Sequence, residues 1–224
     1  MQAVIPAAGE GIRMRPLTLT KPKPLLEIRG KPLLQHIIEA LPDRVDEIII
    51  VVGYLGQQII DFFGTTFEGK KITYDWQKEK TGTARALQLC KPYLYPGKFL
   101  FLNADDIINT ETLERALSHD LCIVTVHRED WQRWGILLLN EDGSVKDFVE
   151  KPQTFISNIA NTNMMVLDGR IFEFEPDQHS SGEFYLTTMV QKLAREHKIY
   201  TEPASLWISV GTPEDLQKAE DMLK

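Results

Sequence analysis

Glycines, cations and prolines crowd one stretch near the start of the chain, IPAAGEGIRMRPLTLTKPKPL, which covers residues 5–25. Gly9 and Gly11 follow directly on a hydrophobic run, where glycines let the backbone turn tightly and expose its amide groups. Exposed amides of this kind suit a phosphate. Arg13 would add a planar fork of donors and Lys23 a point charge, and both disperse phosphate charge. These residue types, in this order, indicate a site for a polyphosphate.

Three prolines lie between and beside the two cations. Because proline fixes φ and lacks an N–H group, Pro16, Pro22 and Pro24 exclude a helix and predict an extended segment. A stiff arm of this kind would hold Arg13 and Lys23 on opposite sides of a bound polyphosphate. A solvated basic loop with prolines as spacers is the alternative that these residues alone leave open.

Two familiar nucleotide-binding loops do not fit this stretch. A dinucleotide-binding loop needs a third glycine, where Met14 stands, and an acidic residue at the end of the second strand, which reads VVGYLG. A Walker-type phosphate loop needs Gly-Lys-Ser or Gly-Lys-Thr, which does not follow Gly11. The polyphosphate site must therefore be of another kind.

Polar residues after two later hydrophobic runs could complete such a site. Asp105 and Asp106 end the run FLNADD, and ligands of open α/β sheets bind outside the strand ends. A carboxylate there can hold Mg²⁺, which keeps several waters and bridges phosphate oxygens. A helix cap before INTETLERAL is the alternative. Gln77 offers a donor and an acceptor to the edge of a base, and Gly82 permits a close backbone approach, although an ordinary strand-to-helix turn would contain the same pair.

Several of these motifs, in this order, resemble the sugar-1-phosphate nucleotidylyltransferases, also called nucleotide-sugar pyrophosphorylases. The segments GEGIRMRPLT and PKPL resemble the glycine loop and basic arm of that family, and WQKEKTGTARAL resembles its base-binding stretch. FLNADD resembles the strand that ends on a magnesium-binding aspartate. The family's sugar-side contacts have counterparts that resemble them in WG at residues 134–135, VEKP, Asn161 and GEFYLTT. The segment SLWISVGTPEDL resembles the closing motif of the family. The resemblance covers nearly the whole chain.

The resemblance implies a role for each matching position. Arg13 and Lys23 would be the catalytic cations, and Asp105 would hold Mg²⁺. The implied nucleotide-binding residues are Ala7, Ala8, Gly9, Gly11, Gln77, Gly82 and Thr83. The implied sugar-phosphate-binding residues are Gly135, Glu150, Lys151, Asn161, Glu183 and Thr187.

The reaction that the resemblance implies joins a nucleoside triphosphate to a sugar 1-phosphate and releases pyrophosphate. The sugar phosphate is already an anion and needs no general base, so catalysis would consist of positioning and charge stabilisation. Arg13 would grip the β- and γ-phosphates. Lys23 would reach the α-phosphate and the incoming sugar phosphate.

The base and the acceptor have alternatives. Ala7-Ala8 before the glycine loop, and Gln77 five residues before Gly82, resemble the uridylyl-transferring branch, which implies UTP or dTTP with a hexose 1-phosphate. The triplet GTA at residues 82–84 also occurs in guanylyl-transferring relatives, which act on mannose or heptose 1-phosphate. Cytidylyl transfer to a phosphorylated alcohol is a third alternative. A catalytically weak regulatory paralogue that binds a nucleotide sugar is a fourth.

One position departs from the family pattern. Relatives usually carry a second metal-holding aspartate two residues before the glycine of the closing motif, where this chain has Ser209. A hydroxyl is a far weaker Mg²⁺ ligand than a carboxylate. The metal would then depend on Asp105 and the phosphates, or Asp106 would take the place of the missing ligand. Because Arg13, Lys23 and Asp105 are all present, we expect an active enzyme with weakened metal affinity.

The elements that must position these residues alternate along the first half of the chain. Strand-like runs (QAVIPAA, EIIIVVG, KKITYDW, KFLFLNADD) alternate with segments of helical period (PLLQHIIEAL, LGQQIIDFFG, TARALQLC). This alternation predicts right-handed crossovers and a Rossmann-like α/β fold, a mostly parallel sheet flanked by helices.

From about residue 121 the pattern changes to strands with short turns. LCIVTVHR, WGILLLNEDGSVKDFVE and NTNMMVLDG predict antiparallel pairing, and helices are expected near residues 186–197 and after a Thr212 cap. We expect one nucleotidyltransferase domain over residues 1–224. Its nucleotide-binding half would cover about 1–120, and its more antiparallel, sugar-phosphate-binding half about 121–224.

Composition limits the partners and the location. Lys and Arg number 25 against 32 Asp and Glu, a net charge of −7, which argues against nonspecific nucleic-acid binding. Cys90 and Cys122 lie in apolar runs, and we expect free buried thiols in a reducing cytoplasm. We see neither a leader nor a membrane-spanning stretch. The expected partners are small molecules, without nucleic acid or membrane, and a homo-oligomer is left open.

Overall fold

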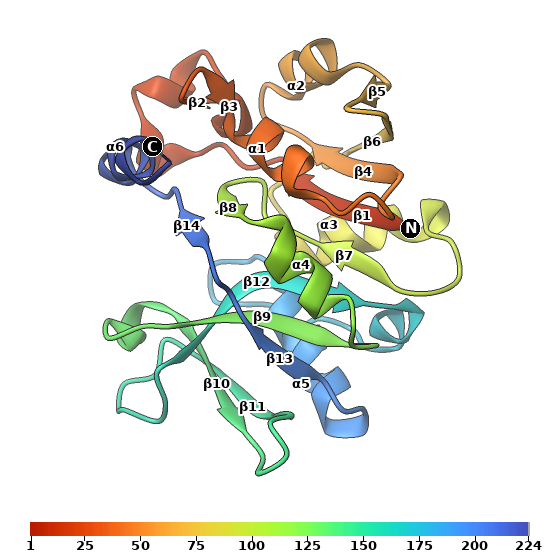
Figure 1. The fold of residues 1–224 in the computed structure, drawn as a ribbon, viewed down its shortest axis with the longest axis vertical. Coiled ribbons are helices and arrows are strands. Elements are labelled where there is room, and N and C mark those ends of the chain that lie inside the picture. The colour runs from red at the N-terminus through yellow and green to blue at the C-terminus, as the bar shows by residue number, and fades with distance from the viewer. Residues whose placement is uncertain (224) are drawn as a thin grey trace.

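The central feature of the fold is one mixed sheet of ten strands, drawn as a ribbon in Figure 1. This computed structural model describes residues 1–223. Four strands from the first half of the chain lie parallel in the order β7-β1-β4-β6. Their bounds are Gln2–Ala7 for β1, Glu47–Val52 for β4, Lys70–Trp76 for β6 and Phe99–Phe101 for β7.

Helices cover both faces of this parallel part, and β1 shows why. Ala3, Ile5 and Ala7 belong to one hydrophobic cluster and Val4 to another, since successive side chains of a strand point to opposite faces. Helices α1, α2 and α4 contribute to the first cluster, and α3 and α5 to the second. The helix bounds are Leu33–Ala40 for α1, Gly56–Phe63 for α2, Thr83–Cys90 for α3, Thr110–Ala116 for α4 and Leu186–Glu196 for α5.

The second half of the chain extends the same sheet with mostly antiparallel strands. β12 lies antiparallel beside β7, and both β9 and β10 pair with β12. β11 forms a hairpin with β10, and β13 pairs in parallel with β9. The bounds are Cys122–His127 for β9, Gly135–Leu139 for β10, Val145–Glu150 for β11, Ile159–Leu167 for β12 and Tyr200–Pro203 for β13. The two halves therefore share one sheet.

A smaller layer closes the fold beside the basic arm. β14 (Trp207–Ser209) pairs antiparallel with β8 (Asp106–Ile108) and leads to α6 (Pro213–Met222). Thr212 and Asp215 cap α6 reciprocally, because each side chain accepts a hydrogen bond from the backbone N–H of the other. Three further strands are short: β2 is Glu27–Ile28, β3 is Lys31–Pro32 and β5 is Thr66–Phe67.

The predicted α/β class is confirmed, but the predicted conformation of the basic arm is wrong. Residues 12–25 contain three short 3₁₀ turns, at residues 12–14, 17–19 and 23–25, and are not extended. The fixed φ of proline is compatible with a 3₁₀ turn, and the missing N–H does no harm in a first turn. Pro24 stands in the first turn of the third of these elements. Proline therefore excludes a long helix here without forcing an extended chain.

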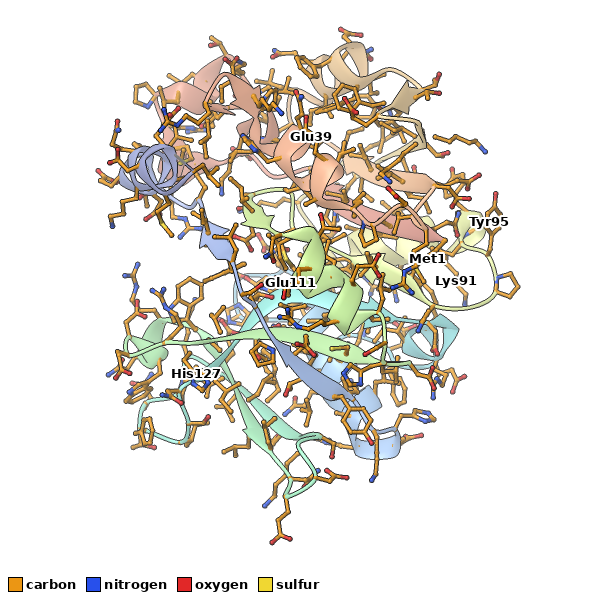
Figure 2. All side chains as sticks on the ribbon, in the orientation of Figure 1. Met1, Glu39, Lys91, Tyr95, Glu111 and His127 are labelled. Carbon is orange, nitrogen blue, oxygen red and sulfur yellow. The ribbon has the colours of Figure 1, made fainter. Side chains whose placement is uncertain are left out.

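The N-terminus of the chain lies at the end of the sheet opposite the carboxyl ends of the parallel strands. Figure 2 shows Met1 and Tyr95 together at one side of the molecule, and the ammonium group of Met1 pairs with Asp46 at 2.6 Å. The carboxyl ends of β1, β4, β6 and β7 lie at the opposite edge of the sheet. Within residues 1–223, no helix is both long and apolar enough to cross a membrane.

The two cysteines are free and buried, as the sequence predicts. Cys90 lies at the end of α3 and Cys122 begins β9. Burial raises the pKa of both thiols to about 12. Neither thiol is therefore a candidate nucleophile.

Candidate active site

A cleft of about 1240 Å³ lies at the carboxyl ends of the parallel strands. It is lined by residues from both halves of the chain, and most of the residues singled out from the sequence are among them. Those that line it are Ala7, Ala8, Gly9, Gly11, Arg13, Lys23, Gln77, Gly82, Thr83, Asp105, Glu150, Lys151, Glu183 and Thr187. Gly135, Asn161, Asp106 and Ser209 are not part of the lining.

The glycine loop lies directly after β1 and packs tightly against the basic arm. Gly11 has φ +60°, and a Cβ atom there would lie 3.0 Å from both Lys23 Cβ and Thr18 Cγ2. The Thr18 hydroxyl donates a hydrogen bond of 2.8 Å to the carbonyl oxygen of Gly11. A side chain at position 11 would therefore push the loop away from Lys23, so the glycine fixes how closely the loop and the arm approach.

The two cations reach the cleft from different turns of the arm. Lys23 is 8% exposed and forms an ion pair with Asp105. The Arg13 guanidinium lies near the closing motif, with Nη2 3.5 Å from the position that a Cβ atom of Gly211 would occupy. Lys23 is therefore buried beside the Asp105 carboxylate, whereas Arg13 lies against the backbone of a glycine, Gly211.

The two aspartates face in different directions. The Asp105 side chain is 34% exposed and lines the cleft. Asp106 is 3% exposed, accepts a 3.0 Å hydrogen bond from Asn103 Nδ2 and is also hydrogen-bonded by Ser209, its register partner on β14. Burial, followed by the charge of Asp105, raises the pKa of Asp106 to about 7. Asp106 is therefore buried behind the cleft with the half-buried Ser209 as its partner, and neither residue is part of the lining.

The donor set of the cleft fits a magnesium ion only if phosphate shares in binding it. Among residues 1–223, no three acidic, histidine or cysteine side chains gather as a metal cage. Mg²⁺ does not need one, because it is commonly held by one or two carboxylates, phosphate oxygens and waters. The exposed carboxylate of Asp105 can supply the single protein ligand, provided that Lys23 shares or releases it.

The amide of Gln77 has a fixed orientation. Its Nε2 donates to the carbonyl oxygen of Gly82 at 3.0 Å and to Thr81 Oγ1 at 2.9 Å. A backbone carbonyl can only accept, so the nitrogen must be the atom that faces it. Both N–H groups are thereby used inside the protein. Oε1 has no partner among the described residues, and Gln77 therefore offers an acceptor to a ligand.

Backbone contacts tie the two halves together beside Gln77. Gly82 has φ +90°, and a Cβ atom there would lie 2.4 Å from the carbonyl oxygen of Phe184. Ala84 N–H donates to that oxygen at 3.0 Å, and Phe184 N–H donates to the Thr81 carbonyl at 2.9 Å. Leu186 N–H donates to Thr83 Oγ1 at 3.0 Å. Glycine at position 82 is therefore needed for this junction.

The acidic and basic residues of the second half lie on the other side of the cleft. Glu183 pairs with Lys80 at 3.1 Å, a contact that crosses between the halves. Glu150 and Lys151 both line the cleft. Gly135 lies behind Glu150, where a Cβ atom would lie 2.5 Å from the Phe148 ring and 2.8 Å from a Glu150 carboxylate oxygen. Gly135 therefore makes room for that ring and that carboxylate and does not reach the cleft itself.

Asn161 is placed differently from the expectation of a direct sugar contact. It is 4% exposed, and its side chain is engaged with Asn163, whose own side chain does line the cleft. The register of β12 against β9 shifts between Asn161 and Met165, and Asn163 has φ +58°. This bulge brings residue 163 to the cleft, and a strict alternation read from the sequence does not reveal it.

Several other residues of the lining were not singled out from the sequence. The tryptophan of β6 is 43% exposed, and glycine at the start of α2 leaves room for its indole. The additional residues include Tyr54, Trp76, Asn103, Asn163, His179 and Tyr185. Trp76 stands directly before Gln77 at the end of β6, and that adjacency is the one signal that could have identified it.

Comparisons with known proteins cover the whole chain. A family model described as nucleotidyl transferase matches residues 2–224. The bifunctional protein GlmU of Methanocaldococcus jannaschii is 34% identical over 226 residues, which is 100% of this chain and 54% of GlmU. The UTP–glucose-1-phosphate uridylyltransferase AglF of Haloferax volcanii is 32% identical over 241 residues, covering 100% of this chain and 97% of AglF.

A solved structure shows the same fold. A UDP-glucose pyrophosphorylase complexed with UDP-glucose superimposes with a TM-score of 0.87 at 23% identity, over 99% of this chain and 97% of that one. The chain spans about half the length of the GlmU proteins that it matches. With a family model over almost every residue and a relative of similar length, the chain belongs to the nucleotidyl transferase family.

Proposed function

We propose that the protein transfers a nucleotidyl group from a nucleoside triphosphate to a sugar 1-phosphate and releases pyrophosphate. The observation that carries the proposal is the lining of one cleft. The nucleotide half contributes the glycine loop, two cations and an exposed carboxylate. The other half contributes carboxylates and a lysine, which suit a polyhydroxylated acceptor. AglF, which has nearly the same length as this chain, bears the name of such an enzyme.

The reaction is a displacement at the α-phosphorus. A phosphate oxygen of the sugar 1-phosphate attacks in line, the bond between the α-phosphorus and the α–β bridging oxygen breaks, and pyrophosphate leaves. No proton has to be removed, because the attacking oxygen is already anionic. Catalysis therefore depends on positioning and on cations that meet the developing charge.

The chain supplies those cations from fixed places. Arg13 binds the leaving pyrophosphate, and Lys23 neutralises the α-phosphate and the attacking phosphate. Asp105 would hold Mg²⁺, which when bound supplies charge neutralisation to the phosphate oxygens. Ala7, Ala8, Gly9 and Gly11 present backbone to the triphosphate, and Glu150, Lys151, Glu183 and Thr187 face the acceptor.

The orientation of Gln77 favours a class of base. Its free Oε1 accepts a hydrogen bond, so the edge of the base that meets it must present an N–H group. Uracil and thymine present an imide N–H and guanine a lactam N–H at the ring position, whereas cytosine and adenine can donate only from their exocyclic amino groups. UTP, dTTP and GTP can therefore meet Oε1 with a ring N–H, and the name of AglF favours a uridylyl donor among them.

The test is a coupled pyrophosphate-release screen of UTP, dTTP, GTP, CTP and ATP against a panel of sugar 1-phosphates and phosphocholine. We expect turnover with a sugar 1-phosphate, best with UTP or dTTP. Turnover only with phosphocholine would replace the acceptor class. Tight binding of a nucleotide sugar without pyrophosphate release from any pair would identify a regulatory protein and overturn the proposal. We further propose a cytoplasmic enzyme, with a homo-oligomer open to measurement.

A further inference from the structure

The side chain of Asn163 stands at the acceptor side of the cleft in an unusual conformation. Its φ of +58° is left-handed, a region that asparagine tolerates better than most residues. The residue is exposed and lines the cleft, although both of its neighbours in β12 are buried. A bulge in β12 thus brings one polar side chain out of an otherwise buried strand.

Asn161 determines which end of the Asn163 amide faces the cleft. The backbone N–H of Asn163 donates to Asn161 Oδ1 at 2.8 Å. Because a backbone N–H can only donate, the oxygen of the Asn161 amide is identified, and its other atom must be the nitrogen. That nitrogen, Nδ2, donates to Asn163 Oδ1 at 2.7 Å. The acceptor end of Asn163 is therefore occupied by its buried neighbour.

The donor end of Asn163 is left for a ligand. Asn163 Nδ2 has no hydrogen-bond partner within residues 1–223, and the cleft is the open side of the residue. An amide nitrogen can only donate. The group that meets it must consequently be an oxygen, such as a hydroxyl, ring or carbonyl oxygen, and a protonated amine would be repelled.

We infer that Asn163 is an acceptor-binding residue that donates its amide hydrogens to an oxygen of the sugar, and that Asn161 is the positioning residue that fixes this polarity. The inference rests on the proposed nucleotidyl transfer. In place of the expected direct contact of Asn161 with the sugar, Asn163 contacts the sugar and Asn161 orients the Asn163 amide. It also limits the substrate to sugars with an acceptor oxygen at this place, as opposed to a free, protonated amino group.

The first test is Asn163→Asp, which keeps the shape and the hydrogen bond from Asn161 but removes both donors. Calorimetry compares the nucleotide sugar that the wild type makes with the matching nucleoside diphosphate. Loss of one hydrogen bond should weaken nucleotide-sugar binding roughly 3- to 10-fold and leave diphosphate binding within about twofold. Asn158→Asp, the same exchange before β12 and outside the cleft, is the matched control and should change neither.

The second test is Asn161→Asp, which keeps the acceptor for the Asn163 N–H but loses the donor. The amide of Asn163 would then turn its nitrogen towards position 161, so its oxygen would face the sugar. We expect the same selective loss in nucleotide-sugar binding, with KM for the sugar 1-phosphate raised and KM for the triphosphate unchanged. A melting temperature measured for each variant establishes that it folds. If Asn161→Asp does not fold, the result for Asn163→Asp alone decides the test.

The outcomes are distinct. Unchanged binding of the nucleotide sugar by Asn163→Asp, or an equal loss for the nucleotide sugar and the diphosphate, overturns the inference and leaves the proposed function in place. Absence of a nucleotide-sugar product from the wild type overturns the proposed function, and the inference with it.

Discussion

The ion pair between Lys23 and Asp105 joins the two groups on which the proposed chemistry most depends. Each partly neutralises the other while no ligand competes for them. A triphosphate brings more negative charge than one carboxylate, so it draws the lysine towards the phosphates and leaves Asp105 available to a cation. Removing either partner should therefore affect the other.

Replacing either cation should slow transfer strongly. Arg13→Ala and Lys23→Ala each remove a positioned charge that meets the transition state, and we expect kcat/KM to fall about 10²-fold or more. Lys21→Ala and Arg44→Ala are matched controls, since both side chains are exposed and pair with Glu27 and Glu114, and none of these four residues lines the cleft. Near wild-type rates in both cation variants would remove these residues from the mechanism.

Asp105→Asn should change the metal dependence. The substitution keeps the volume but removes the anion, so the Mg²⁺ concentration that gives half-maximal rate should rise at least about tenfold. The measurement is a rate titration with Mg²⁺ at saturating substrates, with the melting temperature as a check on folding. A titration identical to that of the wild type would show that the metal is held elsewhere.

Asp106 should influence stability through pH. Its pKa is raised to about 7 by burial, whereas the unfolded chain loses this proton near 3.8. Between these values the folded protein keeps a proton that the unfolded chain has released, so stability falls as pH rises from about 4 to about 7. Asp106→Asn removes this dependence. Its melting temperature relative to the wild type should rise between pH 5 and pH 8, and a constant difference would contradict the assignment.

At the scale of elements, the junction between the loop at 81–84 and the start of α5 is the part most sensitive to substitution. Gly82→Ala would place a methyl group 2.4 Å from the Phe184 carbonyl oxygen at φ +90°. We expect a loss of about 1–3 kcal/mol in stability and a higher KM for both substrates. Gly97→Ala is the control, because φ there is also positive, +117°, but no other heavy atom of residues 1–223 lies within 4 Å of the added Cβ. Equal effects of the two variants would show that only backbone strain matters.

Elements were predictable wherever periodicity decides them. The helical spacing at residues 33–40 folds as expected because burial follows the helical period. The uninterrupted apolar run at residues 47–52 folds as expected because a parallel strand with helices on both sides is buried on both faces. The basic arm was not predictable, since proline restricts φ in the same way in 3₁₀ and extended chains. The bulge at Asn163 and the pairing of Asp106 with Ser209 depend on contacts between distant strands, which local sequence does not encode.

At the scale of the whole molecule, the two halves of the chain share one sheet, and a domain boundary near residue 120 would cut through it. β7, from the first half, lies between β1 and β12, and β12 comes from the second. We expect one cooperative unfolding transition, so far-ultraviolet circular dichroism and tryptophan fluorescence should give the same midpoint in guanidinium chloride. Two separated midpoints would show that the halves unfold independently.

The buried thiols have a practical consequence for measuring motion in the cleft. Cys90 and Cys122 are the two cysteines of the chain, both are buried, and their raised pKa leaves almost no thiolate at neutral pH. Maleimide and spin-label reagents should therefore leave the native protein unmodified. Thr154→Cys, at an exposed position outside the cleft lining, would carry the probe alone, so any movement of the segment after Lys151 on ligand binding could be followed spectroscopically without first replacing Cys90 or Cys122.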